Sequence, residues 1–109
     1  EDFLILCVDD NVVGCVALHR YEEHPAEVAC LYVKQSHEGL GYGRALVESV
    51  EERARGLGIS SVFVFTSRAV PFFENLGYDS ASMDIVPNER ARKFEESNRG
   101  SEVLAKELA

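Results

Sequence analysis

Three alternate glycines mark the loop that most constrains how this chain can fold. Gly39, Gly41 and Gly43 follow an apolar run of strand-forming residues and lead directly into a helical pattern. Glycine allows a tight turn and a close approach of backbone to ligand, and the first amide groups of a helix have no acceptor within it. A strand, glycine loop and helix in this order can bind phosphate groups. The sequence therefore predicts an anion site here, and the expected anion is a pyrophosphate.

Two familiar nucleotide-binding motifs do not fit this loop. A dinucleotide fingerprint needs an acidic residue about twenty positions on, across a crossover, whereas Glu51 and Glu52 fall within the predicted helix itself. A Walker loop needs Gly-Lys-Ser/Thr, which is absent. The ligand of this loop therefore has to be inferred from the order of strands and helices around it.

Apolar periodicity predicts an α/β chain with a mixed sheet. Strands are expected at 3–8, 12–18, 26–33, 62–65 and 78–86, and helices at 42–57, 69–77 and 88–98. The run at 62–65 is continuously apolar, which is typical of a strand buried on both faces and paired in parallel with 26–33. The pattern over 101–108 fits a strand or a frayed helix. The outer face of the long helix, including Glu51, reads as solvated surface.

Composition limits the class of protein. The 109 residues suffice for one domain, expected over 1–109, and the net charge of −8 argues against a nucleic-acid or anionic-membrane partner. Nothing resembles a signal peptide or a membrane span, so we expect a soluble protein. Three cysteines without a disulfide framework suit a reducing cytoplasm or an organelle matrix, and we expect the protein to be cytoplasmic. The cysteines, at positions 7, 15 and 30, have no metal-binding spacing and are expected to be buried in strands, and no metal site is predicted.

The glycine loop, read as Glu38-Gly39-Leu40-Gly41-Tyr42-Gly43, resembles the acetyl-coenzyme A binding motif of the GNAT acetyltransferases. The stretch 69–78, which ends in Leu-Gly-Tyr, resembles the second signature of that superfamily. The resemblance implies a GNAT fold whose two central parallel strands splay apart to admit the pantetheine arm. The implied cofactor contacts are Leu31, Tyr32, Val33, the loop residues Glu38, Gly39, Leu40, Gly41, Tyr42, Gly43 and Arg44, and Phe73.

The C-terminal third resembles the N-acetylglutamate synthase family more specifically. The segments 84–87 and 98–101, together with Glu27-Val28-Ala29-Cys30-Leu31, carry this similarity. In that family the domain transfers acetyl to the amino group of glutamate, the first step of arginine biosynthesis. The resemblance implies that Arg90, Arg99 and Ser101 hold the glutamate carboxylates and that Cys30 lies at the substrate. Without it, the same residues read as a helix with surface charges.

The reaction needs a base, because an ammonium group must lose a proton before its nitrogen can attack a thioester. The resemblance assigns this role to Glu27, which would otherwise read as an exposed residue at a strand end. Many GNAT enzymes protonate the departing thiolate with a tyrosine, but Phe73 stands in that position here. The resemblance then offers Thr66, which could equally cap the next helix. Glu38 is a second departure, since a carboxylate beside a pyrophosphate is unfavourable.

Three functions stay open from the sequence. The first is glutamate N-acetylation, the second is acetylation of another small amine or a protein N-terminus, and the third is a catalytically silent module that binds acyl-coenzyme A. The chain also lacks the helices and first strand that usually come earlier in the superfamily, so we expect a truncated domain. Its expected partners are a second copy or an amino-acid-kinase-like domain fused to it.

Overall fold

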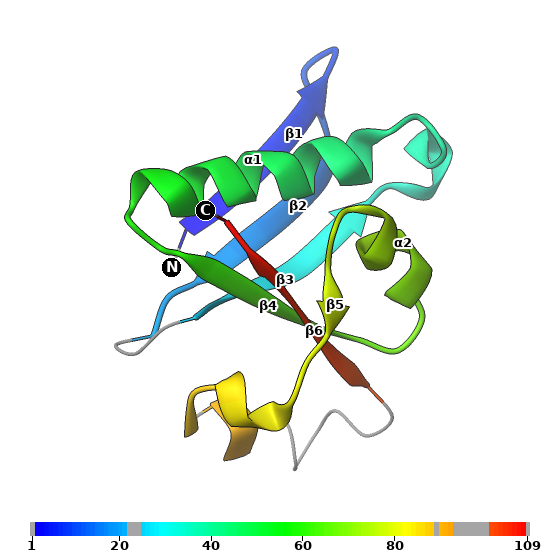
Figure 1. Cartoon of the computed structure of the whole chain (residues 1–109). Helices are drawn as coiled ribbons and strands as arrows, with labels where there is room; N and C mark the ends of the chain where they lie inside the picture. Colours follow the sequence, from blue (N-terminus) through cyan, green and yellow to red (C-terminus); the bar gives the residue numbers. More distant parts are fainter. Residues whose placement is uncertain (1, 22–24, 89, 93–100, 109) are drawn as a thin grey trace.

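The computed structural model describes residues 2–21, 25–88, 90–92 and 101–108 (Figure 1). The elements in chain order are β1 (Asp2–Val8), β2 (Asn11–His19), β3 (Ala26–Val33), the 3₁₀ turn η1 (Gln35–His37), α1 (Tyr42–Gly56), β4 (Ser61–Thr66), α2 (Val70–Asn75), β5 (Asp79–Ser80), the 3₁₀ turn η2 (Met83–Ile85) and β6 (Glu102–Glu107). The expected strands at 3–8, 12–18, 26–33 and 62–65, and the two helices that follow the glycine loop, are therefore confirmed.

All six strands form one mixed sheet in the order β1-β2-β3-β4-β6-β5. The pair β3 and β4 is parallel, as the sequence predicted, and the other neighbours are antiparallel. The parallel pairing is short, since only Ala26 with Val62 and Glu27 with Phe63 are in register. Beyond these two residues the strands separate, which Figure 1 shows as two diverging arrows. This is the splay that the GNAT resemblance implied.

The helix α1 covers one face of the sheet over β1, β2 and β3 (Figure 1). Its buried apolar residues recur at helical spacing, as Leu46, Val47, Val50 and Ala54. They pack in one core cluster with Val16 of β2 and other strand residues of the same face. Close approach at the sheet depends on Gly14, because a Cβ there would lie 2.8 Å from the Tyr32 carbonyl oxygen and 2.9 Å from Leu46 Cδ1. A second, smaller cluster on the opposite face joins Phe63, Val86 and Val103.

The expected strand over 78–86 is largely wrong. Only Asp79 and Ser80 form a strand, and η2 follows them. The Ser82 hydroxyl accepts a hydrogen bond from the Asp84 amide at 3.1 Å, and this local bond competes with a β ladder. The segment 101–108 resolves as strand β6, which pairs along its length with β4. Of the expected helix 88–98, residues 89 and 93–98 lie outside the described part; 88 and 90–92 are helical.

Glu51 corrects the expectation of a uniformly solvated outer face on α1. Its side chain is only 3% exposed. It accepts hydrogen bonds from Tyr78 Oη at 2.8 Å and from Lys106 Nζ at 3.1 and 3.2 Å, and Lys106 also donates to the Leu76 carbonyl at 2.8 Å. Burial and the adjacent Glu51 carboxylate raise the pKa of Tyr78, so its hydroxyl stays a donor. This network ties α1 to β6 and to the end of α2.

The expectation of buried cysteines is also wrong. Cys7 and Cys30 are exposed and Cys15 is half-buried. In β1 the even-numbered Leu4 and Leu6 face the core under α1, and Cys7 therefore falls on the opposite face with the exposed Phe3 and Ile5. An apolar strand pattern does not say which of its faces is covered.

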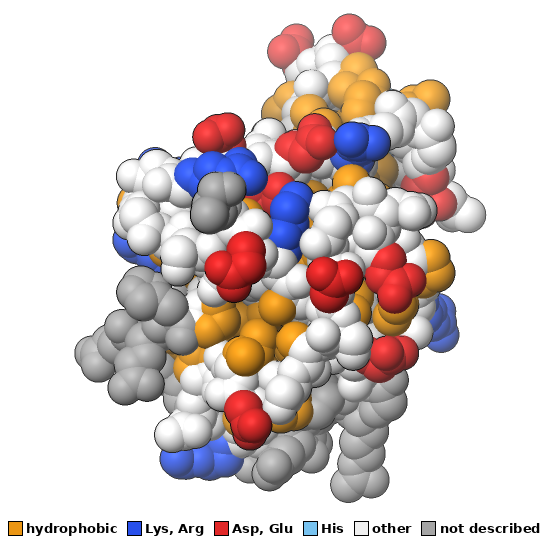
Figure 2. All heavy atoms as spheres, in the orientation of Figure 1, with side chains coloured by type: hydrophobic (Ala, Val, Ile, Leu, Met, Phe, Trp, Pro, Cys, Tyr) orange, Lys and Arg blue, Asp and Glu red, His pale blue; other side chains and the backbone are white. Residues whose placement is uncertain are grey.

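Charged side chains are interspersed on the face that α1 covers (Figure 2). Acidic and basic groups lie beside one another there, as in the exposed pair formed by Arg44 Nε and Glu48 Oε2 at 3.0 Å. Figure 2 shows no broad basic surface on this face. Within the described ranges, no helix has the length and apolar character needed to cross a membrane.

The Glu51 network leads to a stability prediction. Lys106→Met leaves a buried carboxylate without its cation, so we expect the free energy of unfolding to fall by about 3 kcal/mol. Arg44→Met is the matched control, because it removes a cation from an exposed ion pair and should cost less than about 1 kcal/mol. Urea unfolding followed by circular dichroism measures both values. An equal fall in the free energy of unfolding in the two variants would show that the buried pair stabilises the fold no more than the exposed pair does.

Candidate active site

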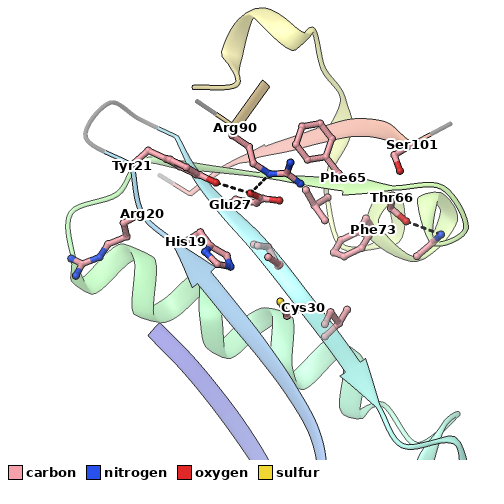
Figure 3. Close-up of a pocket in the computed structure, with 15 residues that line it drawn as sticks. His19, Arg20, Tyr21, Glu27, Cys30, Phe65, Thr66, Phe73, Arg90 and Ser101 are labelled. Atoms are coloured by element: carbon pink, nitrogen blue, oxygen red, sulfur yellow. Dashed lines mark hydrogen bonds and ion pairs between the residues drawn. The ribbon is translucent and has the colours of Figure 1, made fainter. Parts of the chain in front are cut away.

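A pocket of about 750 Å³ opens where β3 and β4 separate (Figure 3). Its walls come from the end of β2, from β3, from β4 and from the start of α2, with Arg90 and Ser101 added from the C-terminal part of the chain. Backbone pairing explains its position. After Glu27, β3 continues to pair with β2 and β4 continues to pair with β6, so their facing edges are left apart.

Glu27 lies at the closed end of this pocket, at the last residue that pairs across β3 and β4. It is only 4% exposed. Arg90 Nε donates to Glu27 Oε1 at 2.7 Å, and Tyr21 Oη donates to the same oxygen at 2.9 Å. The Arg90 guanidinium also lies over the Phe65 ring, 4.5 Å from its centroid. Burying a carboxylate without such partners costs free energy, and here the Arg90 cation and the Tyr21 hydroxyl offset that cost.

The sequence identified Glu27 and Arg90 but not their contact. Arg90 was expected at a substrate carboxylate, and in this structure it is ion-paired with Glu27. The two residues are 63 positions apart in the chain, and no local pattern relates them. They meet because the segment that follows β5 packs on the face of β4 that carries Phe63 and Phe65 (Figure 3).

A bulge in β3 shapes the wall of the pocket. The ladder with β2 shifts register between Cys15 and Ala17, where Cys30 and Leu31 together lie opposite Val16. Cys30 has φ +56°, a left-handed conformation that costs a non-glycine residue free energy. Its carbonyl lies 3.6 Å from the Cys15 sulfur, which donates to it. The bulge turns the last residues of β3 away from β4, and Cys30 and Leu31 both line the pocket.

The glycine loop meets α1 at the other end of β3. Gly39 and Gly41 have φ values of +79° and +84°, and Gly41 is the N-cap of α1. The first helical bond runs from the Ala45 amide to the Gly41 carbonyl at 3.1 Å, so the earlier amides of the turn have no acceptor in their own helix. The His37 ring, before the loop, stacks on the Tyr42 ring at the start of α1, with centroids 6.1 Å apart. Such a terminus suits an anion.

The remaining loop residues are accessible. Glu38, Leu40 and Arg44 are exposed, as is Tyr32 at the end of β3, and Val33 is half-buried. Gly43 packs closely, since a Cβ on it would lie 3.4 Å from the Phe72 ring. The exposed position of Glu38 leaves its carboxylate room to remain in solvent.

Thr66, Phe73 and Ser101 also line the pocket. Thr66 Oγ1 accepts a hydrogen bond from the Ala69 amide at 2.9 Å, which is the helix-capping contact that the sequence allowed. Its hydroxyl proton is still able to donate elsewhere. Phe73 is buried and makes edge contacts with Phe72 and Tyr78. Arg99 lies outside the described residues.

Three adjacent residues at the end of β2 line the pocket without having been identified from the sequence. They are His19, Arg20 and Tyr21. In the sequence, residues 19–21 belong to a polar connection between two strands, and no motif there indicates a catalytic or binding role. The register of β2 could have found one of them, because His19 lies directly opposite Glu27 in the antiparallel ladder.

Comparisons with known proteins agree with this geometry. The family model "Acetyltransferase (GNAT) family" matches residues 1–78. The amino-acid acetyltransferase of Neisseria meningitidis serogroup A is 34% identical over 109 residues, and that of Aeromonas salmonicida is 36% identical over 110. These matches cover 99% and 100% of this chain but 25% of each relative. The chain thus spans about a quarter of their length.

A solved structure extends the likeness. N-acetylglutamate synthase from Neisseria gonorrhoeae, complexed with coenzyme A and N-acetyl-glutamate, superposes with a TM-score of 0.93 at 34% identity. The match covers 98% of this chain and 26% of that one. The sheet order, the divergence of β3 and β4, the glycine loop and these comparisons establish that the chain belongs to the GNAT acetyltransferase family.

Proposed function

We propose that this chain is an acetyltransferase domain that moves the acetyl group of acetyl-coenzyme A onto the α-amino group of L-glutamate. The observation that carries the proposal is Glu27, a buried carboxylate at the head of an opening between two parallel strands. The glycine loop and the start of α1 follow at the far end of β3. The relatives named amino-acid acetyltransferase, and the neighbour that binds coenzyme A and N-acetyl-glutamate, support this acceptor.

Acetyl-coenzyme A fits along β3. Its pyrophosphate would take the free amides at the start of α1, and its pantetheine arm would replace the missing β4 partner beside Leu31, Tyr32 and Val33. The loop residues from Glu38 to Arg44 border the diphosphate in this arrangement. Phe73 supplies an apolar wall for the arm.

The order of bond changes follows from the acceptor. Its ammonium group first gives a proton to Glu27, directly or through water. The nitrogen then forms a bond with the thioester carbonyl carbon, the C–S bond of coenzyme A breaks, and the nitrogen gives up a second proton as the amide forms. The coenzyme A thiolate takes up one of the two protons, so the products are the N-acetyl amino acid, coenzyme A as the thiol, and one proton released to solvent.

Thr66 is the proposed donor to this thiolate. No tyrosine serves this role in α2, because Phe73 occupies the place. The Thr66 hydroxyl accepts from the Ala69 amide, which orients its proton away from α2 and is compatible with donation to a sulfur in the pocket. A thiolate is a tolerable leaving group near neutral pH, so this hydroxyl assists and does not have to ionise.

The acceptor carboxylates have cationic candidates in Arg90 and Arg99, and Ser101 and Cys30 are further candidates for contact with the acceptor. Arg90 donates from Nε to Glu27, so it would bring positive charge to an acceptor carboxylate beside the base. We further propose that residues 1–109 act as one domain of a longer cytoplasmic enzyme. The quarter-length match supports fusion to another domain, such as an amino-acid-kinase-like one, and pairing with a second copy is a compatible arrangement.

Thiol release from acetyl-coenzyme A tests this function. The chain is incubated with glutamate, aspartate, ornithine, other amino acids and simple amines. We expect turnover selective for glutamate, and we expect Glu27→Gln to lower kcat by about 100- to 10,000-fold while coenzyme A still binds.

Each other outcome of this assay has a definite meaning. Selective turnover of a different amine would overturn glutamate as the acceptor. Binding of coenzyme A without turnover on any acceptor would overturn catalysis by this chain. Full activity of Glu27→Gln would remove Glu27 from the reaction.

Gly41→Ala tests the anion site. The positive φ at this N-cap strains an alanine, so the loop should relax and the affinity for coenzyme A should fall about 5- to 10-fold. Gly56→Ala is the matched control, because Gly56 ends the same helix, has open space for a Cβ and lacks a positive φ. Calorimetric titration with coenzyme A should give the wild-type affinity for this control. Equal affinity in Gly41→Ala would place the diphosphate elsewhere.

A further inference from the structure

Tyr21 is held firmly beside the proposed base. It follows the end of β2, and its ring stacks on Phe63 with centroids 6.3 Å apart and an interplanar angle of 27°. The ring packs against the second hydrophobic cluster, which consists of Phe63, Val86 and Val103. The hydroxyl then reaches Glu27 Oε1 at 2.9 Å. A ring fixed by packing gives its hydroxyl a fixed position as well.

The donors to Glu27 converge on one of its two oxygens. Tyr21 Oη and Arg90 Nε both donate to Oε1, at 2.9 and 2.7 Å. Among the residues that the structure describes, no donor reaches Oε2. Figure 3 shows the carboxylate with its bonded oxygen toward Tyr21 and Arg90 and its second oxygen toward the pocket. The carboxylate therefore has one anchored oxygen and one that faces the space where an amine would bind.

We propose that Tyr21 is a positioning residue for Glu27, one that fixes Oε1 so that Oε2 receives the proton of the acceptor amine. The inference rests on the proposed function, in which Glu27 is the base. Arg90 alone cannot fix the Glu27 carboxylate equally well, because one hydrogen bond from a guanidinium still allows rotation about the Cγ–Cδ bond of Glu27. The second donor restricts this rotation, since Tyr21 precedes β3 in the chain and Arg90 follows η2, so the two approach from different segments.

Other groups face Glu27 and have to be separated from Tyr21. Arg90 contributes its positive charge, and His19 lies opposite Glu27 on β2 and lines the same pocket. From β4 the neighbouring side chain is the apolar Phe63. Removal of only the Tyr21 hydroxyl leaves these groups in place, so Tyr21→Phe isolates the contribution of the hydrogen bond.

The experiment compares Tyr21→Phe with Tyr78→Phe. Both substitutions remove a hydroxyl that donates to a buried glutamate, but the partner of Tyr78 is Glu51, which is not in the pocket. We expect Tyr21→Phe to lower kcat about 10-fold and to leave the affinity for coenzyme A unchanged.

Tyr78→Phe should lower stability and leave kcat at the wild-type value. A wild-type kcat in folded Tyr21→Phe would overturn the proposal, and so would equal changes in the two variants. If Tyr21→Phe does not fold, 3-fluorotyrosine is placed at position 21. Its altered hydroxyl donor should change kcat and keep the affinity for coenzyme A, and an unchanged kcat would also overturn the proposal.

A readout without turnover separates this inference from the proposed function. The carboxyl carbon of Glu27, assigned by NMR with Glu27→Gln, should change its chemical shift in Tyr21→Phe and keep it in Tyr78→Phe. That result with no acetyl transfer to any acceptor would defeat the proposed function and retain the contact. An unchanged signal in Tyr21→Phe would overturn the positioning role whatever the activity.

Discussion

The short pairing between β3 and β4 governs the rest of this molecule. Both strands are paired on their outer edges, with β2 and β6, so the sheet stays continuous although its centre opens after two residues. The bulge at Cys30 turns β3 away and accepts a left-handed backbone in doing so. The opening places a buried carboxylate at one end and a helix terminus at the other. The thioester substrate that we propose needs both ends, since its charged part and its reacting carbon lie far apart.

Packing on the two faces of the sheet holds this opening in shape. On one face, Lys106 and Tyr78 converge on the buried Glu51 and connect α1, β6 and the end of α2. On the other, the cluster around Phe63 carries Tyr21 to Glu27. The site is therefore built from segments that lie far apart in the chain and that meet only in the folded sheet.

Local signals predicted much of the fold but little of the site's contacts. The glycine loop, the stripe of α1 and the continuous apolar run of β4 were readable because each depends on residues close in sequence. Glu51 was misjudged because helical spacing cannot reveal a lysine 55 positions later. The contacts of Glu27 with Arg90 and Tyr21 were not foreseen for the same reason. The cysteines were misplaced because an apolar strand does not reveal which face is covered.

Amide hydrogen exchange with and without coenzyme A tests most directly whether the cofactor binds along the separated edge of β3. We expect slower exchange over 28–33 and at the first amides of α1, with β1 and β6 unchanged, since only the open edge and the helix terminus gain partners. Binding of coenzyme A that protects other segments and leaves 28–33 and the start of α1 unchanged would contradict this expectation.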